Sequence, residues 1–207
     1  SSWQDIGRQL YEAGERVERI TGRTKAISHE VISVQAEDSG NISPSSAVEM
    51  FKAYDVITGR DPLVSVTVVH PPHGDEPHWH AHRISVAFER PIHSKVCAAL
   101  VTRLGEHLAY GRGRISAAAS TRRDVTDGYR SIQEEGALET VRYDRVSGQR
   151  YVVKRPMEEI GLDMLLLASA PVVTQRGGKR VGAILSPKPS MRAADVGALV
   201  WHVIGSN

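Results

Sequence analysis

Apolar and polar residues recur along the chain with two different periods, and these periods predict a mixture of helices and strands. Where apolar residues fall three or four positions apart, with charged residues between them, an amphipathic helix is predicted. The helices predicted in this way span residues 3–20, 44–58, 94–110 and 193–204. Ser43 is predicted to cap the second of them, with Pro44 as its first helical residue, and Gly59 to end it.

Runs rich in β-branched residues predict the strands, because such side chains pack well on a pleated surface. The predicted strands are residues 29–35, 63–69 and 79–88, and hairpins are predicted over residues 140–154 and 172–185. The hairpins turn at Ser147-Gly148 and at Gly177-Gly178, where glycine suits a tight turn. The mixture of strands and helices predicts an α+β fold with a central, mainly antiparallel sheet and flanking helices.

The composition is that of a globular chain with one core, since 41% of the 207 residues are hydrophobic and 24% are charged. We expect a single domain over residues 1–207, with residues 110–207 as its C-terminal part. No apolar run approaches the roughly 20 residues that cross a bilayer, and no signal peptide is visible. Cys97 is the one cysteine, so we expect no internal disulfide and a cytoplasmic location. The net charge of +2 is compatible with nucleic-acid binding without indicating it.

The candidate chemistry lies in a run of histidines. Five of the nine histidines fall within HPPHGDEPHWHAH, the segment that starts at His70. Side chains alternate along a strand, so His78, His80 and His82 should project to one side of it. His70 ends the preceding strand and should face them across the hairpin. Neutral imidazoles are common ligands of first-row metals, and three of them leave coordination positions open for water or substrate.

This pattern predicts a divalent metal site in the hairpin. Its predicted ligands are His70, His78 and His80. His82 is predicted to support them, and either His82 or His73 is an alternative to one member of the trio. Asp75 and Glu76 are expected to supply a fourth ligand or to hold an imidazole in the required tautomer. The competing interpretation is a solvated, histidine-rich loop whose imidazoles pair with these two carboxylates.

Two stretches form a recognisable motif: HEVIS, which starts at His29, and LVSVTVVHPPHGDEPHWHAHRISVAF over residues 63–88. Together they resemble the core of conjugative relaxases from mobilisable plasmids, which belong to the HUH endonuclease superfamily. In that family a strand that ends in histidine is followed by a turn and a Pro-His-x-His strand, and Pro77 precedes His78 here. The resemblance covers residues 28–90 and implies an HUH architecture with Mn²⁺ or Mg²⁺, or alternatively Zn²⁺, on the histidines.

The resemblance also implies a nucleophile, usually a tyrosine on a helix ahead of the HEVIS-like strand. Tyr11 is the tyrosine that precedes this strand here. Residues 181–205 resemble the opening strand and nucleophile helix of a relaxase, and they place His202 at the nucleophile position. A circularly permuted chain order accounts for this, because closed folds accept new termini at surface loops. The competing interpretation is an ordinary amphipathic helix that packs inward.

A third candidate nucleophile is Tyr151. The segment Tyr-Val-Val-Lys that it starts matches the Tyr-x-x-Lys signature of rolling-circle replication initiators, which share the HUH metal site. In those proteins the tyrosine lies on a helix, whereas Tyr151 is predicted to lie on a hairpin strand. The resemblance to relaxases therefore competes with a resemblance to replication initiators.

The function that the relaxase resemblance implies is metal-dependent nicking and strand transfer on single-stranded DNA at a plasmid origin of transfer. A covalent protein–DNA intermediate and accessory proteins of a relaxosome belong to this expectation. Contacts to the DNA backbone are expected from two basic clusters: Arg112, Arg114, Arg122 and Arg123, and Arg176, Lys179 and Arg180. The alternatives are a replication initiator, another metalloenzyme such as a cupin, and a nucleic-acid-binding or structural protein without catalysis. A cupin is disfavoured because no glutamate follows His82 before Glu89.

Overall fold

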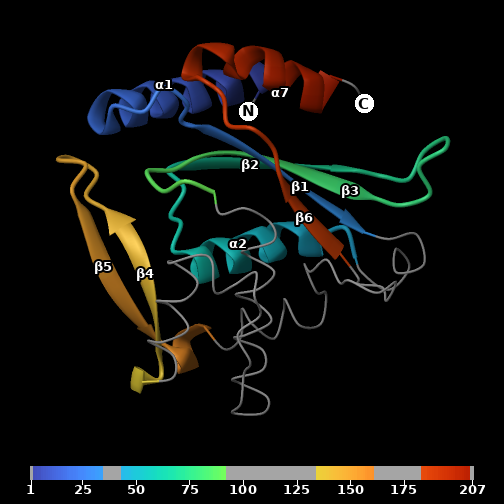
Figure 1. The fold of residues 1–207 in the computed structure, drawn as a ribbon. Coiled ribbons are helices and arrows are strands. Elements are labelled where there is room, and N and C mark those ends of the chain that lie inside the picture. The colour runs from blue at the N-terminus through green and yellow to red at the C-terminus, as the bar shows by residue number, and fades with distance from the viewer. Residues whose placement is uncertain (1, 35–42, 92–133, 161–182, 206–207) are drawn as a thin grey trace.

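A four-stranded antiparallel sheet forms the centre of the computed structural model, which describes residues 2–34, 43–91, 134–160 and 183–205 (Figure 1). Its strands are β1 (Ile27–Val34), β2 (Val64–His70), β3 (His80–Val86) and β6 (Ala183–Pro187). They lie in the order β2-β3-β1-β6, and each neighbouring pair is antiparallel. The strand nearest the C-terminus therefore pairs with the first strand of the chain.

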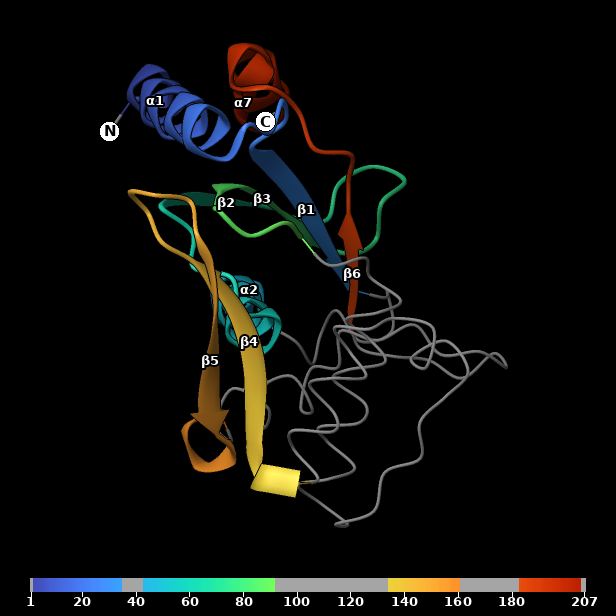
Figure 2. The ribbon, with the colours of Figure 1, turned by 60° about the vertical axis from the view of Figure 1, so that its left-hand side comes forward.

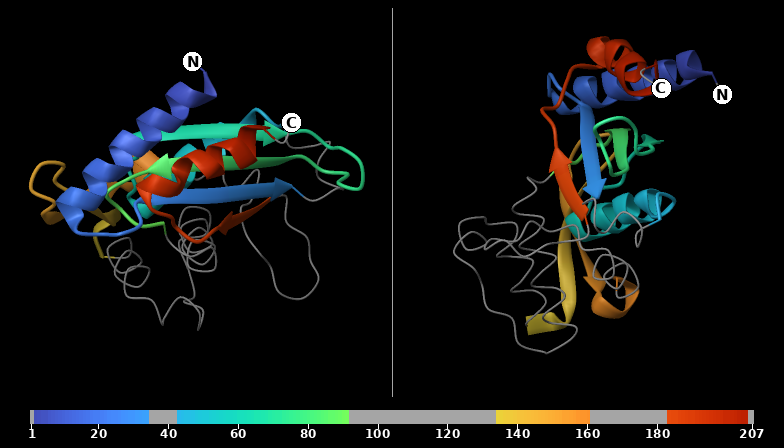
Figure 3. Two further views of the ribbon diagram at one scale, coloured as in Figure 1. Left: turned by 90° about the horizontal axis from the view of Figure 1, so that it is seen from above. Right: turned by 90° about the vertical axis from the view of Figure 1, so that its right-hand side faces the viewer.

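Two helices from opposite ends of the sequence cover one face of this sheet. They are α1 (Trp3–Thr21) and α7 (Val196–Gly205), and the 3₁₀ turn η2 (Ala193–Asp195) leads into α7 (Figures 1 and 3). A capping box between Ser2 and Asp5 begins α1, and Gly22 ends it in the left-handed conformation. The core between the two helices and the sheet contains residues from both layers: Leu10, Val17, Ile27, Ile84, Val86, Val196, Val200 and Val203.

The opposite face of the sheet packs against α2 (Ser46–Thr58) and carries buried charges (Figure 1). Glu30 on β1 accepts hydrogen bonds from Arg60 at 2.5 Å and from Arg83 at 3.1 Å. Arg83 also donates two hydrogen bonds to Asp55, at 2.5 and 2.8 Å. Its guanidinium carbon lies 4.6 Å from the centre of the Phe51 ring. These four charged residues are named the ion-pair network below.

A separate two-stranded hairpin flanks α2. It consists of β4 (Ala137–Tyr143) and β5 (Arg150–Pro156). Its turn contacts α1, and its other end lies on the far side of α2 (Figure 2). Gly148 in its turn has a φ of 72°, which only glycine adopts without strain. Asp61, close behind α2, pairs with Arg142 and Arg145 of the hairpin. Ion pairs therefore hold the hairpin against the segment that follows α2.

The predicted elements agree with most of this architecture. The predicted strands, the hairpin that turns at Ser147-Gly148 and the helices near both ends are confirmed within one to four residues of their bounds. The prediction that Ser43 caps α2 is wrong, because the helix begins at Ser46 and its N-cap, Ser45, makes no capping hydrogen bond. Ser43 instead accepts a hydrogen bond from the Ser45 backbone.

The fold is a mixed α+β arrangement around an antiparallel sheet, as the sequence predicts. The helix predicted over residues 94–110 lies outside the described residues, as does the turn at Gly177-Gly178. Among the helices that the structure describes, none combines the length and the apolar character that a membrane span requires.

Candidate metal centre

Three histidines converge on the face of the sheet that α1 and α7 cover. His70, the last residue of β2, lies directly opposite His80, the first residue of β3. His82 lies two positions further along β3 and therefore projects to the same side. One ring nitrogen from each of the three lies within 4.8 Å of the others. This spacing suits three imidazoles that share one metal ion.

His78 lies outside this group, although the sequence predicts it as a ligand. The strand begins at His80, so His78 belongs to the connection before it and not to the alternating part of β3. Its ring centre lies 6.5 Å from that of His80, whereas the ring centres of His80 and His82 are 5.1 Å apart. The structure thus assembles His70, His80 and His82, which corresponds to the alternative in which His82 replaces one member of the predicted trio.

A cavity of about 200 Å³ opens at the cluster. Its described lining consists of His70, His73, Glu76, His80, His82, His202 and Val203. The first five of these residues come from the β2–β3 hairpin, and the last two come from α7. Figure 3 shows how α7 reaches this end of the hairpin by crossing above the strands. The C-terminal helix therefore closes one side of a cavity that the hairpin begins.

Hydrogen bonds orient two of the imidazoles. The Nε2 atom of His70 lies 3.0 Å from the carbonyl oxygen of Val203, to which it donates. The Nδ1 atom of a neutral His70 then keeps its lone pair for a ligand. His29 on β1 stacks on His82 with ring centres 5.1 Å apart, and its Nε2 atom lies 2.8 Å from Nδ1 of His82. His82 keeps a lone pair at Nε2 only in the tautomer in which it donates to His29.

The environment keeps these imidazoles uncharged. Burial lowers the pKa of His82 to about 3, with further contributions from the neighbouring histidines, His29 first. Burial also lowers the pKa of His80, and His70 adds to that effect. The pKa of His29 is lowered by burial as well. Because only a neutral imidazole offers a lone pair, burial keeps His80 and His82 in the form that binds metals.

The two predicted carboxylates differ in position. The Glu76 carboxylate lies 3.5 Å from Nδ1 of His80 and lines the cavity, where it can orient that ring. Asp75 lies in the exposed turn of the hairpin and is not among the described residues that line the cavity. His73 lines the cavity, and its backbone pairs with that of Glu76 across the turn.

The three predicted nucleophiles lie in three different places. His202 on α7 lines the cavity beside the histidine cluster. Tyr11 lies on the exposed side of α1, and a hydrogen bond to Glu15 raises the pKa of its hydroxyl. Tyr151 lies on β5 with half of its surface exposed. Neither tyrosine is among the described residues that line the cavity.

The remaining predictions about individual residues have separate outcomes. Trp79 alternates with the histidines along the sequence, and its side chain is 1% exposed and therefore packs in the core. The predicted DNA contacts, Arg112, Arg114, Arg122, Arg123, Arg176, Lys179 and Arg180, lie outside the described residues.

Sequence reasoning gave no site role to His29. A signal was present, because His29, Val31 and Ser33 alternate along β1 and pair with Ile84, His82 and His80 of the adjacent strand. This register places His29 on the histidine face, diagonally across from His82. The contribution of the Val203 carbonyl had no sequence signal, since it depends on where α7 packs.

The chain matches no family model, no curated protein and no solved structure among those compared. Its function must therefore be inferred from the site itself.

Proposed function

We propose that this protein is a metal-dependent endonuclease of the HUH type that nicks single-stranded DNA and forms a covalent adduct through His202. The observation that carries the proposal is the position of His202, which lines the same cavity as His70, His80 and His82. More than a hundred residues of sequence separate His202 from the hairpin. An ordinary inward-packed helix would have no need to bring a histidine to this cavity.

The chain order supports a permuted arrangement. The segment that resembles a relaxase's opening strand and helix is described as β6 and α7. β6 pairs with β1, the strand that carries HEVIS, and α7 packs over the same sheet (Figure 1). A strand and helix that would come first in a relaxase thus lie next to the core strands, although they come last in this sequence. Circular permutation changes chain order while it keeps such neighbours in place.

The donor set fits a divalent metal ion. Three imidazole nitrogens lie within 4.8 Å of one another, and the low pKa of His82, about 3, keeps it neutral. His70 and His82 each have a hydrogen-bond partner that fixes the ring, as ligating histidines usually do. A bound metal ion would polarise the phosphate oxygens and stabilise the charge that develops during the reaction.

The residues of the chain perform the other steps. The imidazole of His202 forms a nitrogen–phosphorus bond as the bond from phosphorus to the departing 3′ oxygen breaks. That oxygen takes a proton from the solvent and becomes a 3′ hydroxyl, while the 5′ phosphate stays on His202. Glu76 holds the His80 ring from 3.5 Å away. The adduct conserves the bond energy, so the same 3′ hydroxyl can reverse the step and rejoin the strand.

Two exposed aromatic rings lie together on α1 and α7. Trp201, next to His202, is 60% exposed, and its ring lies edge-on to that of Trp3 with centres 5.6 Å apart. Exposed aromatic rings provide stacking platforms for the bases of single-stranded nucleic acids. The pair therefore offers a stacking surface for a nucleobase on the helices α1 and α7, the second of which carries His202.

The test is a cleavage assay on single-stranded oligonucleotides that tile the DNA flanking the coding sequence, with Mn²⁺ or with chelator. We expect a protein–DNA adduct that requires metal and that is lost in H82A and in H202A, whereas Y11F and Y151F retain it. A phosphoramidate on histidine is labile in acid and a phosphotyrosine is stable, so brief acid treatment identifies the linkage. Adduct formation by H202A would contradict the assignment of the nucleophile.

The outcomes also separate the alternatives. An acid-stable adduct lost in Y151F would indicate the replication-initiator chemistry. Binding of oligonucleotides by wild-type protein, with neither cleavage nor adduct across the full set, would indicate a nucleic-acid-binding protein without catalysis and overturn the proposal.

A further inference from the structure

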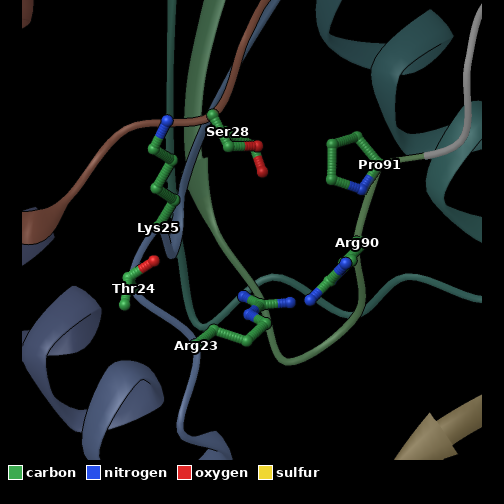
Figure 4. A pocket seen from close by; sticks show the side chains of 7 residues that line it. Arg23, Thr24, Lys25, Ser28, Arg90 and Pro91 are labelled. Carbon is green, nitrogen blue, oxygen red and sulfur yellow. The ribbon is translucent and has the colours of Figure 1, made fainter.

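A second cavity, of about 300 Å³, lies where three segments meet away from the histidines. The connection between α1 and β1 contributes Arg23, Thr24 and Lys25, and the first part of β1 contributes Ser28. The loop after β3 contributes Arg90 and Pro91, and the segment between β6 and η2 contributes Ser190. Figure 4 shows the side chains of Arg23 and Arg90 pointing toward one another across this cavity.

The described lining carries three cations and no carboxylate. Among the described residues, neither Lys25 nor Arg90 has an ion-pair partner within 4.0 Å. Arg23 donates its two terminal nitrogens to the carbonyl oxygens of Ala87 and Phe88, each at 2.9 Å. These acceptors are uncharged, and Arg23 has no ion-pair partner within 4.0 Å among the described residues; Glu89 acts on its charge only from a greater distance.

Arg23 itself has an unfilled hydrogen bond. Its Nε atom is buried and has no acceptor among the described residues, as is also the case for Nε of Arg60, whose charge, unlike that of Arg23, is paired with Glu30. Burial lowers the pKa of Arg23, and the charge of Arg90 lowers it further, so the two guanidinium groups destabilise one another. A buried donor without a partner costs free energy, and so do converging like charges, unless an anion compensates both.

In the ion-pair network, by comparison, the buried arginines have carboxylate partners from the chain itself. Arg60 and Arg83 are fully or almost fully buried, and Glu30 and Asp55 neutralise them. The cavity at Arg23 has no equivalent carboxylate among its described residues. An anion from outside the chain would play the role that Glu30 and Asp55 play for the network.

The chemistry of the lining favours a phosphate group over a carboxylate. Arginine presents a planar fork of donors, and lysine adds a compact positive charge. The hydroxyls of Thr24, Ser28 and Ser190 add neutral donors around the cations. Three positive charges match a doubly charged tetrahedral anion better than a singly charged planar one. The volume exceeds that of a single phosphate, so the phosphate can be part of a larger molecule.

We propose that the cavity formed by Arg23, Lys25 and Arg90 is a phosphate-binding pocket, separate from the histidine cluster. Ser28 and His29 are consecutive on β1 and face opposite sides of the sheet. Of the clustered histidines on β3, His82 is the one nearer to this pocket. It pairs with Val31, and Val31 lies about 10 Å along β1 from Ser28. The phosphate belongs either to a nucleic-acid backbone that also reaches the histidines or to a free phosphate compound. The pocket does not depend on the nuclease proposal.

The test is a calorimetric titration of the wild-type protein with sodium phosphate in the presence of chelator. Sodium chloride and sodium acetate at equal ionic strength are the control titrants. Chelator excludes phosphate capture by a metal on the histidines. We expect phosphate to bind and acetate not to bind. The variant K25Q/R90Q should weaken phosphate binding by at least about tenfold. Lys25 and Arg90 are exposed at the cavity rim, so the variant should fold.

The matched control is R150Q, which removes one positive charge from an exposed position on β5. It should bind phosphate as wild type does. Equal phosphate binding by K25Q/R90Q and wild type would overturn the proposal, as would equal weakening in R150Q. Failure of wild type to bind phosphate more tightly than chloride would also overturn it.

A second arm identifies the source of the phosphate. Fluorescein-labelled oligothymidine and a mixed-sequence oligonucleotide are titrated with both variants. If the pocket holds a backbone phosphate, K25Q/R90Q should weaken both oligonucleotides alike and lower the salt dependence of binding. If phosphate binding is lost while oligonucleotide binding is unchanged, the pocket serves a free phosphate compound. Neither result depends on cleavage, so the nuclease proposal is tested separately.

Discussion

The two faces of the central sheet carry titratable side chains on adjacent residues of the same strands. On one face these side chains are paired with opposite charges, and on the other face they are not. On β1, His29 faces α7 and Glu30 faces α2; on β3, His82 and Arg83 divide in the same manner. Burial disfavours the charged form of each group. Arg83 has Glu30 and Asp55 beside it, and their charges outweigh burial and raise its pKa. His82 has only other imidazoles, so its pKa falls to about 3.

This difference distinguishes the side chains that stabilise the fold from those that are available to a ligand. The ion-pair network has all its principal charges compensated within the chain, so it has little to offer a ligand. The histidine cluster borders a cavity, and burial lowers the pKa of His80 and His82, so these two keep lone pairs available. Polar groups that the chain has already paired hold the fold together, and those that it leaves available mark the candidate site.

Replacing Arg83 with methionine should have the largest effect on stability. Methionine keeps much of the contact with Phe51 but leaves the Asp55 carboxylate without its main partner and Glu30 with Arg60 as its only cation in the network. Removing one member of a buried pair costs roughly 3–5 kcal/mol of unfolding free energy. Urea denaturation measures this loss. K52M, which breaks an exposed pair with Glu49, should unfold as wild type does, and equal behaviour of the two variants would contradict the role given to the network.

On the histidine face, H82A should weaken the binding of Mn²⁺ or Zn²⁺ by about a hundredfold or more, because it removes one of three ligands. H78A is the matched control, since His78 lies outside the cluster, and it should bind metal as wild type does. Calorimetry on protein stripped of metal gives both affinities. The reverse pattern would restore the trio that the sequence predicts.

The covering of the histidine face can be tested at Gly14, where α1 packs tightly. A methyl group there would lie 2.8 Å from Ile27 and 2.9 Å from Ala193. G14A should therefore destabilise the fold by about 1–3 kcal/mol through overpacking. G7A, in the same helix with nothing within 4 Å of the added atom, should stabilise it by about 0.5–1 kcal/mol. Thermal unfolding distinguishes the signs, and a neutral G14A would show that α1 can shift away from the sheet.

The smallest effect is a pH dependence of the metal-free protein. Because the folded-state pKa of His82, about 3, lies below the unfolded value, the unfolded state binds more protons as the pH falls below about 6.5. The contribution of His82 to stability should therefore decrease from pH 7 to pH 5, whereas the Asp55 and Glu89 carboxyls, whose pKa burial raises, act in the opposite direction equally in wild type and in a His82 variant. H82N should lose less stability over this range in urea denaturation. Equal losses in H82N and wild type would show that His82 is not held neutral by the fold.

Local patterns predicted the elements better than they predicted the site. The alternation of apolar residues was enough to predict β1, β2 and β3, and Ser147-Gly148 was enough to predict a hairpin. Whether a strand begins at Trp79 or at His80 depends on the pairing of His80 with His70, which sequence period does not reveal. His78 lies in the connection before β3 and outside the cluster, so His82 is the third member of the cluster.

The contacts between distant segments could be predicted only in part. The resemblance of residues 181–205 to a relaxase's opening segment indicated His202, which does line the cavity. The hydrogen bond from His70 to the Val203 carbonyl depends on the exact height at which α7 packs, and no residue type encodes it. The basic cavity combines residues from three parts of the chain, none of which forms a motif by itself.

The position of α7 has a consequence for synthesis of the protein on the ribosome. His202 follows His82 by 120 positions, so the hairpin emerges long before the helix that completes its cavity. At about 5–20 residues per second, this interval lasts roughly 6–24 seconds. During that time β1 lacks its neighbour β6, and the histidine face lacks half of its helical cover. The nascent chain thus completes the cavity at its histidines only after α7 has been released from the exit tunnel.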